Sequence, residues 1–101
     1  NKKKMIEKRK IVIAWYRPSQ WDRLLEISLD ADELEKTYQE WITQAEEKID
    51  KMKKIGLNPV KIDVDVEKLK KWCEKVNQPI DGSARVEYAI YAAQDEENVL
   101  E

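Results

Sequence analysis

Residues 34–56, LEKTYQEWITQAEEKIDKMKKIG, contain the most regular apolar pattern in the chain. Apolar side chains recur every three or four positions, as on one face of an α-helix, and charged side chains fill most other positions. The apolar set is Leu34, Tyr38, Trp41, Ile42, Ala45, Ile49, Met52 and Ile55. Asp30 and Glu33 form a helix-start signal, and Gly56 with Pro59 forms a stop signal. The pattern predicts one amphipathic helix of about 25 residues, roughly 38 Å long, docked lengthwise on the rest of the fold.

Two strands are predicted, one on each side of this helix. Residues 11–16 are a short β-branched and aromatic run that is stopped by Pro18, which indicates a strand covered on both faces. Residues 60–67 alternate apolar and charged side chains, which is typical of a half-buried strand. Two strands joined through helices usually lie parallel, so we expect a small two-stranded sheet in which both strands are edges.

Shorter helices complete the predicted fold. Ser19 precedes a short helix over 21–28, and Asp65 precedes a helix over 66–76. Residues 84–92 fit either a helix or a strand, and their alanines with the cap candidates Asp81 and Ser83 favour a helix. The predicted class is α+β and mainly helical, in the order strand, helix, long helix, strand, helix, helix. The sheet is three-stranded if 84–92 is a strand.

Length and charge indicate how the chain is organised. The 101 residues suit one domain, predicted over 10–95, with a loose basic tail at 1–9 and an acidic tail at 96–101 whose Leu100-Glu101 has the composition of a cloning scar. No apolar run approaches the roughly 18 residues of a membrane span, so no membrane association is expected. The net charge is −2, and the basic excess lies in residues 1–10, which argues against nucleic-acid binding. A cytoplasmic location fits the single cysteine.

The chain lacks the residue sets on which most catalytic sites depend. Cys73 is the only cysteine and there is no histidine, so neither a zinc site nor a cysteine–histidine pair is expected, and Cys73 is predicted to be buried. Asp63 and Asp65 are interpreted as the solvated side of a strand rather than as an acid–base pair. Only two glycines are present, far apart, which excludes a glycine-rich phosphate loop. No enzyme activity, cofactor or metal is predicted.

Aromatic and arginine side chains gather near two predicted helix starts. Trp15, Arg17 and Trp21 lie at the first strand-to-helix corner, and Arg85 and Tyr88 lie in the last helix. Lysine outnumbers arginine fifteen to four, which suggests roles that need a planar guanidinium.

Two interpretations of this cluster are open. In the favoured one, Arg17 and Arg85 pair with acidic residues such as Asp22 or Asp81, and the tryptophans fill the core. In the other, Arg17, Trp21, Arg85 and Tyr88 line a pocket for a small anion, together with backbone amides after Ser19 or Ser83.

Several of these segments together resemble a family of small uncharacterised bacterial proteins. The segments are Ile13-Ala14-Trp15-Tyr16-Arg17-Pro18 with Trp21, Thr37-Tyr38-Gln39-Glu40-Trp41, Trp72-Cys73, and Asp81-Gly82-Ser83-Ala84-Arg85. The resemblance spans nearly the whole chain. It implies a bacterial, cytosolic protein and no particular activity.

We therefore expect a small, non-enzymatic interaction or accessory protein. Edge strands and a helix as long as the domain favour a homodimer, formed through the long helix or a strand edge, and a protein partner bound the same way. The alternative is a binding protein for a small anionic ligand at the corner formed by Trp15, Arg17, Trp21 and Arg85.

Overall fold

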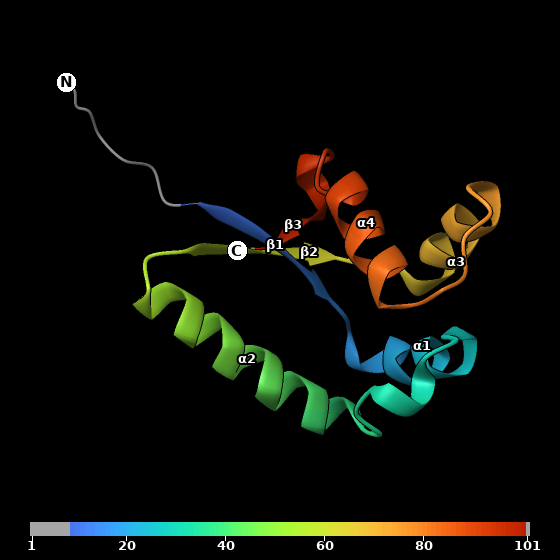
Figure 1. Cartoon of the computed structure of the whole chain (residues 1–101), viewed down its shortest axis with the longest axis horizontal. Helices are drawn as coiled ribbons and strands as arrows, with labels where there is room; N and C mark the ends of the chain where they lie inside the picture. The colour runs from blue at the N-terminus through green and yellow to red at the C-terminus, as the bar shows by residue number, and fades with distance from the viewer. Residues whose placement is uncertain (1–8, 101) are drawn as a thin grey trace.

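A mixed sheet of three strands, in the order β1-β2-β3, forms the centre of the fold (Figure 1). The computed structural model describes residues 9–100, so the predicted basic tail lies outside the described residues apart from Arg9. β1 (Lys10–Trp15) pairs in parallel with β2 (Asn58–Asp63), with Val12 opposite Val60. The two predicted strands and their parallel pairing are confirmed.

The third strand comes from a segment that was predicted to be a tail. β3 (Val99–Leu100) pairs antiparallel with β2, with Val99 opposite Ile62. The chain is turned back to the sheet by a 3-10 turn, η3 (Glu96–Asn98), in which the Asn98 side-chain amide donates to the Ala92 carbonyl at 2.9 Å. Residues 96–100 therefore belong to the fold rather than to the predicted tail over 96–101, and the prediction that both predicted strands are edges is wrong. β2 is the central strand.

The long helix α2 (Tyr38–Lys54) is confirmed but has 17 residues rather than about 25. It begins at Thr37, whose hydroxyl accepts from the Glu40 amide while the Glu40 carboxylate accepts from the Thr37 amide. Asp30 instead precedes a separate 3-10 turn, η2 (Ala31–Glu33), because its carboxylate is held by Arg85. A helix of this length measures about 26 Å, so the expectation of dimerisation from helix length loses its basis.

The other predicted helices are present. α1 (Trp21–Ile27) follows the 3-10 turn η1 (Pro18–Gln20), and α3 (Val66–Lys75) is capped by Asp65. Residues 84–92 lie in α4 (Gly82–Ala92), so the favoured helix is confirmed and the strand alternative is wrong. The Asp81 carboxylate starts α4 by accepting from the Ala84 amide at 2.9 Å.

The helices cover the two faces of the sheet unequally. α2 lies on one face, mainly against β2, and α4 lies on the opposite face, mainly against β1 (Figure 1). The largest fully buried side chains come from β2, from α1, from α3 and from the residues just before α3; they are Trp21, Leu24, Ile62, Leu69, Val64, Val66 and Cys73. Because α2 is centred on β2, the α2-facing side of β1 is only partly covered.

Candidate functional site

Arg85 belongs to a buried ion pair. Its two terminal nitrogens donate to the two carboxylate oxygens of Asp30, both at 2.8 Å, and one of them also donates to the Ser28 hydroxyl at 3.2 Å. Arg85 is 8% exposed. The hydrogen bonds from Arg85 hold the pKa of the Asp30 carboxyl below its ordinary value. The planar, bidentate geometry explains why arginine occupies this position, and it ties α4 to the loop that follows α1.

The other predicted site residues lie in separate places. Arg17 pairs with Asp63 at 3.2 Å and is half exposed. Trp21 is 2% exposed, and its indole N–H donates to the Glu35 carbonyl at 3.1 Å. Tyr88 is buried and packs on Trp72 with ring centroids 5.6 Å apart. The arginines thus bind different carboxylates, neither of them the sequence neighbours Asp22 or Asp81, and the tryptophan fills the core.

Five aromatic side chains cluster where β1 meets α1 and α2. Trp41 of α2 contacts Trp15 at 5.1 Å, Tyr16 at 5.3 Å and Trp21 at 5.3 Å between ring centroids. Tyr38 completes the cluster at 5.5 Å from Trp41. Burial raises the pKa of Tyr16 to about 12. The cluster fixes the first turn of α2 against the carboxyl end of β1, and so defines one end of the open edge described next.

The outer edge of β1 is unpaired among residues 9–100. The Arg9 carbonyl accepts from the Asn58 amide at 2.8 Å and the Trp15 carbonyl accepts from the Val64 amide at 3.0 Å. In a parallel ladder with this register, the odd-numbered residues of β1 direct their N–H and C=O groups at β2. The N–H and C=O groups of Lys10, Val12 and Ala14 therefore point outward from the sheet.

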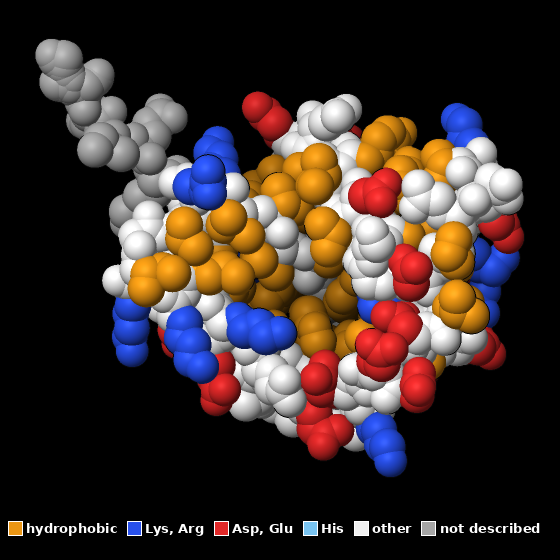
Figure 2. All heavy atoms as spheres, in the orientation of Figure 1, with side chains coloured by type: hydrophobic (Ala, Val, Ile, Leu, Met, Phe, Trp, Pro, Cys, Tyr) orange, Lys and Arg blue, Asp and Glu red, His pale blue; other side chains and the backbone are white. Residues whose placement is uncertain are grey.

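A groove runs along this edge, and we call it the β1 edge groove. Its volume is about 460 Å³. It is lined on the strand by Val12, Ile13 and Ala14, on the loop before α2 by Glu33, Leu34 and Glu35, on α2 by Trp41, Gln44, Ala45, Lys48, Ile49 and Met52, and on α4 by Val86. In Figure 2 this groove is the hollow between α2 and α4, and the side chains inside it are mostly apolar. Unpaired backbone groups and an apolar wall thus lie side by side.

The flank of α4 extends the apolar surface beyond the groove. Val86 is 54% exposed and Ile90, one turn later on the same side of the helix, is 52% exposed. Large apolar side chains that are half exposed next to an open strand mark a surface suited to contact with another protein.

Charges are separated along the same edge. Arg9 and Lys10 lie at the start of β1, whereas Glu33 and Glu35 line the groove at its other end. Figure 2 shows basic side chains on the left of the hollow and acidic ones on the right. Lys48 lies between them on the wall formed by α2. The edge therefore has a basic end and an acidic end.

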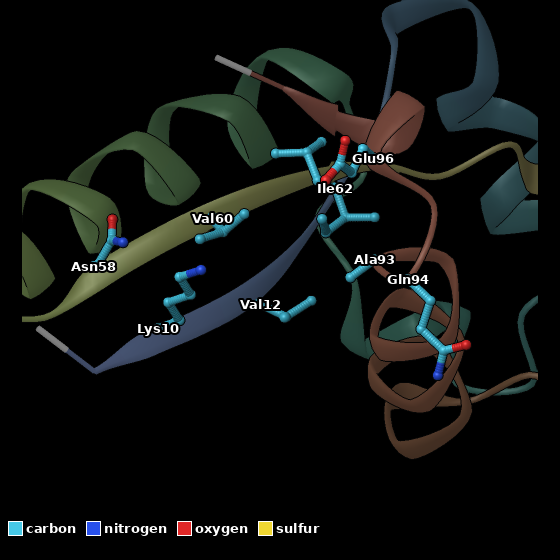
Figure 3. Close-up of a pocket in the computed structure, with 9 residues that line it drawn as sticks. Lys10, Val12, Asn58, Val60, Ile62, Ala93, Gln94 and Glu96 are labelled. Carbon is cyan, nitrogen blue, oxygen red and sulfur yellow. The ribbon is translucent and has the colours of Figure 1, made fainter. Parts of the chain in front are cut away.

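A second hollow, of about 750 Å³, lies on the α4 side of the sheet (Figure 3). Val12, Val60 and Ile62 form its floor, and Ala93 lies on the α4 side of it. Its rim includes Lys10 and Glu96, whose charges are opposite. This hollow therefore presents no single charge for a ligand to match, and its side chains form no convergent set of donors.

The described residues contain no group of three histidine, cysteine, aspartate or glutamate side chains that could hold a metal ion. Over the same residues, no helix combines the length and the apolar composition needed to cross a bilayer. Cys73 is 1% exposed, which confirms its predicted burial, and burial raises the pKa of its thiol.

Sequence reasoning identified strand edges as a feature but did not identify the residues of the groove. Val12 and Ala14 lie in the predicted strand, and only the strand order shows that their backbone groups face outward.

Comparison with protein-family models, curated proteins and solved structures finds nothing that matches this chain. The resemblance to a bacterial family stays a prediction.

Proposed function

We propose that this chain is a non-enzymatic interaction domain that binds an extended segment of a protein along the outer edge of β1. The observation that carries the proposal is the open strand edge with the apolar β1 edge groove beside it. A bound segment would add a strand to the sheet, with backbone hydrogen bonds to Val12 and Ala14 and apolar side chains in the groove.

The composition of β1 supports this proposal. Natural proteins usually protect an exposed edge with charges, proline, bulges or a very short strand. β3 is short, with two residues, but Ile11–Trp15 contains neither a charge nor a proline. An open, uncharged edge of this length favours pairing with another strand.

The walls of the groove define the chemistry of the bound segment. Side chains directed at α2 would meet Leu34, Ala45 and Ile49, so they should be apolar. The acidic end at Glu33 and Glu35 favours a basic residue on the segment. In an antiparallel arrangement that basic residue lies near the amino end of the segment.

The contacts of the arginines give less support to the anionic-ligand alternative. The two terminal nitrogens of Arg85 already donate to Asp30, and Arg17 pairs with Asp63 at the surface. An anion at Arg85 would have to displace a bidentate carboxylate from a buried position, which costs several kcal/mol.

The proposal is tested by adding a peptide of sequence KKVTVTV to the ¹⁵N-labelled protein and following backbone amide signals. The expected result is saturable shifts at Val12, Ala14 and groove residues such as Ile49, with slower hydrogen exchange of the Val12 and Ala14 amides. The amides of Ile11 and Ile13, already bonded to β2, should change little in exchange.

Two variants locate the binding. Val12→Pro removes an outward N–H without breaking the ladder to β2, and Val86→Glu places a charge at the groove wall. Both should abolish the shifts, whereas Leu29→Glu, at a residue 75% exposed in the loop after α1, should not. Val86→Glu keeps the test decisive if Val12→Pro does not fold. Absence of shifts along β1 in wild-type protein diluted until it is monomeric, or equal shifts in Val86→Glu, would overturn the proposal.

A further inference from the structure

We infer that the segment bound at this edge is β1 of a second copy of the chain, antiparallel to the first across a two-fold axis at Val12. This inference rests on the proposed function and names its partner. The pairing of β1 with β1 of the second copy joins the two three-stranded sheets into one continuous sheet.

The backbone of β1 is self-complementary in this arrangement. The outward-facing residues are Lys10, Val12 and Ala14, which are evenly spaced about Val12. In an antiparallel ladder centred there, Val12 pairs with Val12 of the second copy and Lys10 pairs with Ala14. Each pair exchanges both of its backbone hydrogen bonds, so every outward N–H and C=O group of these residues gains a partner.

The charge separation along the edge selects the antiparallel direction. A two-fold axis places the start of β1 of each copy, with the basic side chain of Arg9, at the acidic end of the other copy, Glu33 and Glu35. Side chains alternate between the two faces along a strand, so Arg9 lies on the same face as Ile13 and Trp15, which is the α2 side of the sheet. The loop that carries Glu33 and Glu35 lies on this side as well. Parallel pairing would place like charges together, which is unfavourable.

The exposed flank of α4 also fits a second copy. The two-fold axis is perpendicular to the joined sheet, so both copies carry α4 on the same face of that sheet. α4 of one copy therefore approaches α4 of the other. α4 packs mainly on β1, the edge strand, so its exposed Val86 and Ile90 lie on the approaching side. Their contact would remove apolar surface from water in the isologous manner of two-fold interfaces.

The first experiment measures mass by sedimentation equilibrium over a wide concentration range. The wild-type protein is expected to form a dimer, and Val86→Glu should weaken it by about tenfold or more, while Leu29→Glu should not. The Val12 and Ala14 amides should become protected from exchange as the dimer forms.

The second experiment reverses the charges at each end separately. Arg9→Glu with Lys10→Glu makes both ends acidic, and Glu33→Lys with Glu35→Lys makes both ends basic. Each double variant alone should dimerise more weakly than the wild type, and an equimolar mixture of the two should form a heterodimer. Lys71→Glu with Lys75→Glu, an equal charge change at exposed positions of α3, is the matched control and should leave the dimer unchanged.

The outcomes separate this inference from the proposed function. A protein that stays monomeric at every concentration but binds the KKVTVTV peptide at β1 overturns the second copy as partner and leaves the edge as a binding site. A dimer that Val86→Glu does not weaken, or a mixture of charge variants that forms no heterodimer, overturns the antiparallel arrangement.

Discussion

Replacement of Asp30 by asparagine tests whether the buried ion pair holds α4 to the rest of the fold. The side chains of Arg85 and Asp30 are 9% and 19% exposed, so Asp30→Asn leaves a guanidinium that water reaches poorly and that has lost its counter-charge. Breaking a buried pair in this way costs about 3–5 kcal/mol. For a domain of this size each kcal/mol lowers the melting temperature by roughly 4–8 °C, so the variant should melt at least about 12 °C lower.

Urea unfolding followed by tryptophan fluorescence measures this loss, because Trp21 and Trp41 lie in the core cluster. Asp32→Asn is the matched control, because Asp32 is exposed and lies two residues after Asp30. This substitution should lower the free energy of unfolding by less than about 0.5 kcal/mol. The double variant Asp30→Asn with Arg85→Met should recover part of the stability, since no buried charge remains. Equal stability of the Asp30→Asn and Asp32→Asn proteins would refute the reasoning.

The pH dependence of stability gives a second measure of the same pair. The Asp30 pKa is lowered in the folded state, so below the ordinary carboxyl pKa of about 3.9 the unfolded chain binds more protons than the native one. The contribution of Asp30 is therefore complete above that pH and is lost as pH falls toward the lower folded-state pKa. In Asp30→Asn the decline of unfolding free energy with acid should be shallower than in Asp32→Asn.

Two further predictions concern the start of α2 and the thiol. Thr37→Ala should lower the free energy of unfolding in urea by about 1 kcal/mol, because it removes the hydroxyl that caps α2. Thr43→Ala, inside the same helix, should lower it little, and equal losses in the two variants would contradict the start of α2 at Thr37. Native Cys73 should react with Ellman's reagent at least about 100-fold more slowly than the urea-unfolded chain, since the reaction requires local opening, and comparable rates would contradict its burial.

The spacing of apolar residues predicted the helices and strands that bury one face against the core. Ala45 and Ile49 of α2, Ile62 of β2, and Leu69 and Cys73 of α3 are buried as their spacing indicated. Capping also predicted the starts of α3 and α4, because Asp65 and Asp81 bond to amides within three residues of themselves.

Contacts between residues far apart in the sequence determine the start of α2, the ion pairs of the arginines and the third strand, which local sequence patterns do not show. The acidic residues around Asp30 are a plausible helix start by themselves, but Asp30 binds Arg85, 55 residues away, and α2 begins at Thr37 instead. Local sequence likewise suggests Asp22 and Asp81 as partners of the arginines, whereas Arg17 pairs with Asp63 and Arg85 pairs with Asp30. β3 has two residues, too few for a period of two to be recognised.

The candidate site was only partly predictable. The sequence indicates that β1 is a strand and that some strand must be an edge, but not that β3 covers β2 and leaves β1 open. The groove also depends on α2 being centred on β2, which is a matter of tertiary packing.

The strand order has a consequence for how the chain folds during its synthesis. Lys10 pairs with Asn58, and Ile62 pairs with Val99, so the central strand binds segments from near both ends of the described chain. A nascent chain cannot close the sheet until its last strand has left the ribosome, and until then β2 also has an open side. Closure of the sheet therefore requires contacts between segments that lie far apart in the sequence, and such contacts form more slowly than the local contacts within a helix.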